Sequence, residues 1–564
     1  LDPATGKVLW SHEHGGDQGA MGGGTLIPLP AGDDRIFLMH RNDASVMLQV
    51  TAAKEGGDGF EISELWSNNV IRSSYVHPVI HEGHLYGMSG RIFTCADAAT
   101  GERKWRSRQP GDGFPTLVGD HLVIITKPGT LHVVEANPEA YTEVAQIELF
   151  DEHAWSAVAF QDGHLYARSM GHLARIDAVG DAAESASAKA WLASTEFGAF
   201  LSKLEKESDK NAAIERYLAD QASFPIIEEN GVVHFVYRGE AEDVGIVGDM
   251  IGFRREDPMI RVAGTDLFYY STLLEPDAAV TYGFIPSYET PIADPLNPQL
   301  GRGLFGEVSW FSMPAFQQAE YDGAATDGDK GRLEIVEWTS EAREGQDRKA
   351  TVYLPKAYDA DSERRFQTLY VHDGQGALEG GDLDAALDYF IGSKVEPVIA
   401  VFVMPPEENP RGDARDPAAY SKMVAEELVP LIDGRFRTVK NRNSRASAGA
   451  GGGGTSAMGT AFAYPEVFSK IVAHAPTMIG LGEIGAEIPS SEEHLFQIYQ
   501  SWGAYHLRSP HEAWDMAESN RELWNILRER GYRPAGGENS GGFGWATWRA
   551  QVGDWLTALF PAGS

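Results

Sequence analysis

The stretch RASAGAGGGGTSAMGTAFAYPEVFSKIVAHAP, residues 445–476, decides how the C-terminal part of the chain folds. It has the layout of a strand, a tight turn and a helix, with a second strand following. Gly449, Gly451 and Gly453 occupy alternate positions through the turn. Because parallel strands need a crossover of this kind, the stretch predicts one unit of a parallel sheet.

The alternation of strands and helices extends over residues 330–561. The strand candidates are RKATVYLP, QTLYVHDG, PVIAVFVMP, SRASAGA, KIVAHAP and HLFQIYQSWG. Helices between them include PAAYSKMVAEELVPLIDGRF and AWDMAESNRELWNILRERG. This order predicts a mostly parallel sheet in a three-layer α/β domain.

Residues 1–181 contain a degenerate repeat instead. LDPATGKVLW (1–10) and ADAATGERKW (96–105) share an Asp, a Thr-Gly pair and a closing Trp. With weaker echoes included, the repeat recurs every 39 to 49 residues, with landmarks near Asp2, Thr51, Asp97, Ala136 and Asp177. That is the period of one four-stranded propeller blade, in which Asp and Thr-Gly form a turn and the Trp packs between blades. About four blades are expected here, with the missing blades of a closed ring upstream of Leu1.

Two segments lie between these regions. Residues 182–221 are rich in Ala, Glu and Lys and predict two helices, broken near Ser208 and Asp209, that form a helical connector. Residues 222–320 alternate apolar and polar residues in runs such as VVHFVYRG, which predicts the antiparallel strands of a β-sandwich. The expected architecture is therefore multidomain: a partial β-propeller, a β-sandwich and a three-layer α/β domain.

The repeats, in the form ADAATGERKW, resemble the pyrroloquinoline-quinone-like β-propeller family. That resemblance implies a scaffold or binding propeller, and no cofactor is expected. Residues 222–320 resemble the immunoglobulin-like N-terminal module of enterochelin-esterase-type proteins, and are also similar to isoamylase-type glycan-binding modules. Some relatives bind sugars through exposed aromatic rings, which makes Phe253 and Tyr269 candidate glycan contacts; the alternative is that such rings face the sandwich core.

The last domain resembles the putative-esterase family of α/β-hydrolases, which includes the enterochelin esterases. The matching runs are LYVHDGQGAL, VAEELVPLIDGRFRT, RASAGAGGGG, YPEVFSKIVAHAP and GGFGWATWRAQVGDWLTALFP. The family mechanism needs a serine nucleophile, a histidine base and a carboxylate. Here the serine position falls on Gly451, the histidine position on Phe543, and the carboxylate position on His506, with Asp515 or Glu512 as alternatives for the acid.

A degenerate triad predicts a protein that no longer hydrolyses esters. The resemblance leaves a residual pocket, with backbone amides from the HDGQG run (372–376) and from the helix after GGGGT; its candidate residues are Asp373, Gly374, Gly452 and Trp545. The first hypothesis is an inert, esterase-like subunit for protein docking or assembly. The alternatives are a receptor for a glycan or siderophore-like ligand, and a hydrolase that uses non-family residues such as His474 or His506.

The composition limits the classes of partner that the protein is expected to bind. With 82 acidic and 47 basic residues the chain has a net charge of −35, which disfavours binding to nucleic acids or anionic membrane surfaces. Cys95 is the single cysteine, and it is expected to be a small core residue. No HExxH or matched Cys/His spacing predicts a metal site, and no apolar run reaches the length of a spanning helix. Family resemblance implies export to the periplasm or the cell exterior.

Overall fold

The computed structural model describes residue 5 and residues 7–13, 28–32, 34–39, 44–52, 59–72, 76–177, 192, 194–252, 255–303, 306–323, 330–406, 413–477, 488–509 and 514–563. The chain divides into two compact units, one of sheets before residue 190 and one formed by residues 191–509 and 514–564. Each unit is described by itself.

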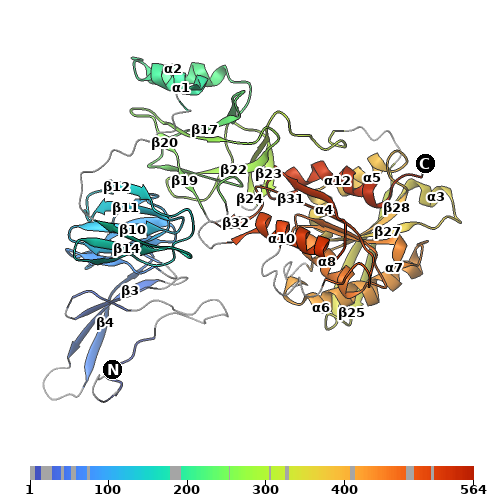
Figure 1. Ribbon diagram of the computed structural model, residues 1–564, viewed down its shortest axis with the longest axis horizontal. Helices are drawn as coiled ribbons and strands as arrows, with labels where there is room; N and C mark the ends of the chain where they lie inside the picture. Colours follow the sequence, from blue (N-terminus) through green and yellow to red (C-terminus); the bar gives the residue numbers. More distant parts are fainter. Residues whose placement is uncertain are drawn as a thin grey trace. The chain divides into compact units, whose positions relative to one another are not determined.

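The first unit consists of antiparallel sheets whose strands follow one another in sequence (Figure 1). Three sheets have four strands and the last has three. The strands are β1 (Leu29–Pro30), β2 (Arg35–Leu38), β3 (Ser45–Ala52) and β4 (Phe60–Asn68); β5 (Val79–His81), β6 (His84–Ser89), β7 (Ile92–Asp97) and β8 (Arg103–Ser107); β9 (Gly113–Val118), β10 (His121–Thr126), β11 (Thr130–Glu135) and β12 (Glu143–Glu148); and β13 (Ala159–Gln161), β14 (His164–Arg168) and β15 (Leu173–Asp177). These consecutive meanders confirm a propeller-like region.

The repeated residues join neighbouring sheets as the repeat predicts. The indole N–H of Trp66, in β4, donates to the Ala98 carbonyl after β7 (3.0 Å), and that of Trp105, in β8, donates to the Asn137 carbonyl after β11 (2.8 Å). Gly101 adopts φ +71°, and a Cβ there would lie 2.6 Å from the Trp66 ring. The Thr-Gly turn therefore needs glycine both for its backbone conformation and for the approach of the neighbouring sheet.

Cys95 is fully buried in the core of this unit, as expected for a small core residue. Burial raises the pKa of its thiol to about 12, so the group stays protonated and unreactive.

The second unit begins with helices and antiparallel strands. The helices are α1 (Glu196–Leu204) and α2 (Lys210–Ala219), and Asp209 caps α2 by accepting from the Ala212 amide (3.0 Å). Two sheets follow, in the orders β16-β17-β21-β20 and β19-β18-β22-β24-β23. Their strands are β16 (Ile226–Ile227), β17 (Val232–Arg238), β18 (Val244–Gly248), β19 (Asp257–Pro258), β20 (Ile260–Arg261), β21 (Leu267–Leu273), β22 (Ala279–Pro286), β23 (Leu300–Gly303) and β24 (Gly306–Ser312). We call residues 226–312 the two-sheet module; its immunoglobulin-like character stays a prediction.

The rest of this unit is an α/β domain around one eight-stranded sheet of order β25-β26-β28-β27-β29-β30-β31-β34, parallel from β28 to β34 (Figure 1). The strands are β25 (Arg332–Ser340), β26 (Gln346–Leu354), β27 (Gln367–His372), β28 (Val398–Val403), β29 (Arg445–Ala450), β30 (Lys470–His474), β31 (Gln497–Gly503) and β34 (Ala535–Asn539), with a small hairpin of β32 (Arg508–Ser509) and β33 (Trp514–Asp515). The helices are α3 (Lys356–Ala360), α4 (Gly374–Glu379), α5 (Leu383–Phe390), α6 (Pro417–Lys422), α7 (Val429–Arg435), α8 (Gly452–Ala463), α10 (Met516–Glu529), α11 (Trp545–Trp548) and α12 (Val552–Leu559).

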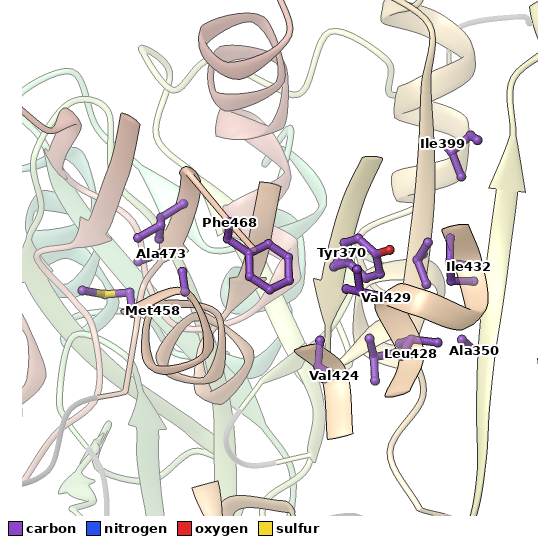
Figure 2. Packing of buried hydrophobic residues seen from close by; sticks show 14 of the residues in the cluster. Ala350, Tyr370, Ile399, Val424, Leu428, Val429, Ile432, Met458, Phe468 and Ala473 are labelled. Carbon is purple, nitrogen blue, oxygen red and sulfur yellow. The ribbon is translucent and has the colours of Figure 1, made fainter. Parts of the chain in front are cut away.

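Apolar cores on both faces of this sheet confirm the predicted α/β domain. On one face, Leu428, Val429 and Ile432 pack with Phe468 and Met458 over the strands (Figure 2). Helices α4, α5 and α12 cover the other face. The predicted long helix 417–436 contains a π-helical turn, Met423–Leu428, between α6 and α7, which the apolar periodicity does not reveal.

Candidate functional site: a degenerate nucleophile elbow

Gly451 stands at the sharp turn between β29 and α8. Its backbone angles are φ 56° and ψ −126°, and its amide donates to the His474 carbonyl (2.9 Å). A Cβ on Gly449 would collide with the backbone of Gly453, and one on Gly453 would lie 2.6 Å from the His372 carbonyl. The flanking glycines thus let the helix approach the sheet, and the turn keeps the geometry of a nucleophile elbow without a hydroxyl.

Aromatic side chains fill the space in front of Gly451. A Cβ at this position would lie 3.1 Å from the Trp548 ring and 3.8 Å from that of Phe543. Phe543 and Trp548 pack edge to face at 4.9 Å, and Trp545 contacts Trp548 at 5.7 Å. We call Phe543, Trp545 and Trp548 the aromatic plug. Phe543 and Trp548 therefore occupy the volume into which a side chain at position 451 would project.

The two other expected triad positions lie together but form no acid–base pair. The rings of His506 and Phe543 stack at 5.4 Å with an interplanar angle of 20°. His506 donates from Nε2 to the Ala475 carbonyl (3.0 Å) and accepts at Nδ1 from the Leu507 amide (2.7 Å). Burial lowers the pKa of His506 to about 4, so the ring is neutral near pH 7 and both its nitrogens are engaged.

One of the two alternatives for the acid, Asp515, is engaged in a helix cap. Asp515 caps α10 by accepting from the Ala517 amide at 2.7 Å and from the Glu518 amide at 3.3 Å. A side chain used as a helix cap is already committed to backbone donors. Glu512 lies outside the described residues.

Ser447 and His372 form a buried histidine–hydroxyl pair in the strands next to the elbow, and this pair is structural. Ser447 donates to the Ala457 carbonyl (2.9 Å), so its oxygen accepts from Nε2 of His372 (2.8 Å), whose Nδ1 in turn accepts from the Tyr420 hydroxyl (2.8 Å). Ser447 is fully buried and its proton points away from the histidine. Burial lowers the pKa of His372 to about 3. These hydrogen bonds therefore connect β27, β29 and the helices, and they do not activate a nucleophile.

His474 is likewise held in the core. Its Nδ1 is hydrogen-bonded to the Ser501 hydroxyl (2.6 Å), and its ring meets Trp548 edge on at 5.8 Å. Burial and the neighbouring His506 lower the pKa of His474 to about 3. The ring is thus neutral near pH 7 and inaccessible to a substrate.

Two of the residues expected to line a residual pocket, Asp373 and Trp545, both lie near Gly376. Asp373 precedes α4 in a left-handed conformation (φ 54°), and a Cβ on Gly376 would lie 2.7 Å from its carboxylate and 3.3 Å from the indole nitrogen of Trp545. Gly374 packs against Phe402, where a Cβ would come within 2.7 Å of the backbone. Gly452 is exposed, with no atom within 4 Å of the place a Cβ would take.

The structure gives the predicted glycan contacts a different setting. Tyr269 is half-buried, and its ring packs edge to face on Phe197 of α1 at 5.4 Å. It therefore helps to attach the helices to the two-sheet module. Phe253 lies outside the described residues.

One buried residue near the loop that carries Phe543 had no signal in the sequence. Asp249, which follows β18 in the two-sheet module, is buried beside Gly542 in the loop that carries Phe543. No motif marks it, because the contact joins segments almost 300 residues apart in the chain.

Family comparisons agree with this architecture. Residues 340–554 match the family described as putative esterase, and residues 1–137 match the family described as outer membrane protein assembly factor BamB. The chain therefore joins a BamB-like N-terminal region to a putative-esterase domain. The predicted resemblances to a quinone-type propeller and to an enterochelin-type esterase are confirmed at this level.

Individual relatives are distant. The chain is 23% identical over 214 residues to the uncharacterized protein YjcH of Bacillus subtilis, covering 36% of this chain and 86% of that protein. It is 29% identical over 182 residues to an endo-1,4-beta-xylanase/feruloyl esterase of Xylanibacter ruminicola, covering 30% of this chain and 25% of the relative.

A solved structure shares the fold. The ferric enterobactin esterase of Salmonella typhimurium superposes with a TM-score of 0.51 at 17% identity, covering 61% of this chain and 98% of that one. At such identity the likeness shows the fold alone. Within the described ranges, no helix is long and apolar enough to cross a membrane.

Proposed function

We propose that this protein is an esterase-like subunit that has lost hydrolysis and acts in binding or assembly with other proteins. The observation that carries the proposal is Gly451, which preserves the elbow's backbone while leaving no oxygen to attack a carbonyl. The family mechanism needs that oxygen, and loss of the nucleophile removes most of the acceleration it provides.

The neighbouring residues reinforce the loss. Phe543 cannot accept a proton, so a hydroxyl placed at 451 would have no base. His506 is neutral, fully hydrogen-bonded and stacked on Phe543, so it cannot orient a base as a carboxylate does. All three positions of the mechanism are thus unsuited to acyl transfer.

Hydrolysis of p-nitrophenyl acetate and butyrate tests the catalytic half of the proposal. The native protein should match the buffer rate at every protein concentration, and the Gly451→Ser variant should do the same. Turnover that scales with native protein and disappears in His474→Gln or His506→Asn would contradict the proposal and identify a hydrolase with non-family residues.

The assembly half rests on the rest of the chain. A BamB-like region, the two-sheet module and an inert α/β domain provide broad surfaces, and the net charge of −35 suits a basic protein partner. The BamB-like match also supports an exported location, in the periplasm or outside the cell. Native mass of the gently isolated protein should reveal an assembly of fixed composition, whereas a lone monomer would count against docking.

A ligand receptor is the second candidate, favoured by the open space at the exposed Gly452 and by Trp545, a half-buried ring beside Gly376. The names of similar proteins suggest enterobactin and ferulate as ligands to try, and the sandwich resemblance suggests glycans. Calorimetry with these compounds should give binding that Trp545→Ala abolishes if the pocket is a receptor. A pure assembly subunit should bind none of them.

A further inference from the structure

Each of the last three sheets of the first unit places four side chains on one face, at equivalent positions of its second and third strands. Strand register fixes the equivalence, because residues that lie directly opposite each other in an antiparallel pair point to the same face. The four residues are Tyr86, Met88, Phe93 and Cys95 in the β5–β8 sheet, Val123, Ile125, Leu131 and Val133 in the β9–β12 sheet, and Tyr166, Arg168, Leu173 and Arg175 in the β13–β15 sheet.

In the first two of these sheets this face packs on the sheet that follows. The ring of Phe93 meets that of Tyr141, which precedes β12, at 6.4 Å. Thr116, which lies opposite Val123, donates from its hydroxyl to the Val158 carbonyl just before β13 (2.9 Å). Seven of the eight residues at these positions are at most 3% exposed, and none is charged. The face is therefore an apolar packing surface between sheets.

The β13–β15 sheet carries a different set of residues on this face. Arg168 and Arg175 occupy two positions that are uncharged in both earlier sheets. Leu173 is 77% exposed and Tyr166 is 37% exposed. A guanidinium that packs on an apolar sheet loses its hydration without gaining a counter-charge, so this face does not suit a further sheet of the same kind. We call these four residues the open face.

Neighbouring groups leave the positive charge of the open face available. Arg175 contacts Asp177 (3.4 Å) and His164 (3.0 Å), but more than half of its side chain is exposed, and exposed ion pairs contribute only about 0–1 kcal/mol. Arg168 is exposed and has no ion pair with any residue that the structure describes. The carboxylate of Glu152 is bonded within the turn that joins β14 to β15.

We propose that the open face is a docking surface for a partner protein that presents carboxylates around an apolar side chain. A guanidinium matches a carboxylate through two parallel hydrogen bonds, and the two arginines flank the apolar contact area of Tyr166 and Leu173. Met170, which is 71% exposed in the adjoining turn, enlarges that area. Arginine, tyrosine and methionine are enriched in protein interfaces.

The charge of the open face favours this occupant over others. It is opposite to the net charge of −35 that the chain carries, so an acidic partner that is repelled elsewhere on the surface is attracted here. A phosphate backbone would leave Leu173 and Met170 in contact with water, so the exposed apolar side chains favour a protein.

This inference rests on the proposed assembly role and deepens it, because it assigns one surface and the chemistry of the partner. An inert esterase-like subunit that assembles through another surface would leave the open face exposed. The assembly role and the open face therefore fail in different experiments.

Hydroxyl-radical footprinting of the native protein, gently isolated in its assembly, tests the proposal. The same preparation is compared before and after transfer to high salt, which weakens contacts between charged groups. Met170 and Leu173 should be oxidised severalfold more slowly in the assembly, because they lose most of their exposed area, whereas Ile147, which is 54% exposed on β12 of the preceding sheet, should be oxidised equally in both states. Equal oxidation of Met170 and Leu173 in the two states overturns the proposal and leaves the assembly role standing; isolation as a monomer overturns both.

Charge reversals in the full-length protein test the chemistry of the partner. Arg168→Glu and Arg175→Glu should each weaken the assembly by about tenfold or more, because a carboxylate would then face the carboxylates of the partner. Both arginines are exposed, so neither variant should unfold the first unit. Arg103→Glu, a matched reversal of an exposed arginine on β8, should leave the assembly unchanged.

Three outcomes of these reversals contradict the proposal. Unchanged binding in both open-face variants removes the role of the arginines. Equal weakening by all three variants shows an effect of overall charge. An assembly that contains only this chain, and whose mass falls to that of one chain in Arg168→Glu, identifies a second copy as the occupant in place of a different, acidic protein.

Discussion

A serine placed at position 451 should cost stability and restore no activity. Gly451 has a positive φ of 56°, where a residue with a Cβ is strained by about 1–3 kcal/mol. Its new Cβ would also lie 3.1 Å from the buried Trp548 ring, and displacing a packed ring costs about 1–3 kcal/mol. Replacing glycine restricts the unfolded chain and returns about 0.4–1 kcal/mol. We expect Gly451→Ser to lower the unfolding free energy by about 2–4 kcal/mol.

Gly459 offers a matched control in the same helix. It is exposed on α8, and no atom lies within 4 Å of the place its Cβ would take. Gly459→Ser should therefore be neutral or stabilise the protein by a few tenths of a kcal/mol, because serine forms helix better than glycine.

Urea-dependent hydrogen exchange of the 445–463 peptide measures both variants in the full chain, since that peptide reports unfolding of the second unit separately from the first. The account predicts a clearly lower urea midpoint for Gly451→Ser and an unchanged one for Gly459→Ser. Equal midpoints for the two variants would refute the view that the elbow backbone is strained and that Trp548 fills the space beside Gly451.

Three other outcomes follow from the structure. Gly101→Ala should destabilise the first unit by about 1–3 kcal/mol more than Gly90→Ala. Both positions have a positive φ, but only a Cβ at Gly101 would meet the Trp66 ring. Urea unfolding followed by peptide-resolved hydrogen exchange compares the two variants, and equal losses of stability would count against the contact between the sheets. Phe468→Ala, which empties a fully buried site in the core of Figure 2, should cost about 3–5 kcal/mol, while the exposed Phe160→Ala should cost under about 0.5 kcal/mol in the same assay. His474 is buried and its pKa is lowered to about 3, so below about pH 6.5 this histidine is protonated in the unfolded chain but not in the folded one. The unfolding free energy of the second unit should therefore fall as the pH falls from about 6.5. His474→Gln should make that pH dependence shallower by about 1.4 kcal/mol per pH unit, and an unchanged dependence would contradict the assignment.

Local signals in the sequence predict the α/β domain well. The apolar runs that become β26 to β31 are buried on both faces, so their composition alone marks them as central strands. The edge strand β34, AGGEN, lacks such a run because its side chains are largely exposed, and no pattern reveals it. Propeller turns are equally local, since Asp97 accepts from the Ala99 and Thr100 amides within the repeat itself.

Non-local contacts limit what the sequence says about the site. The motif positions at Gly451 and Phe543 can be read in the chain, but the filling of the elbow depends on Trp548, which lies almost a hundred residues from Gly451. Tyr269 alternates with core residues in its strand, so its packing on Phe197 depends on where α1 docks. The surroundings of Asp249 are likewise non-local, because it accepts from Thr281 of β22 and lies beside Gly542.

Reaction with a fluorophosphonate, followed by the intact mass of the full-length protein, tests the proposed loss of hydrolysis, since the reagent modifies activated serines irrespective of the natural substrate. We expect the native mass to stay unchanged after prolonged exposure, because Ser447 and Ser501, the serines that contact His372 and His474 near the elbow, are buried in the core. A stoichiometric adduct on any serine would contradict the loss of hydrolytic chemistry and would establish the protein as a working esterase.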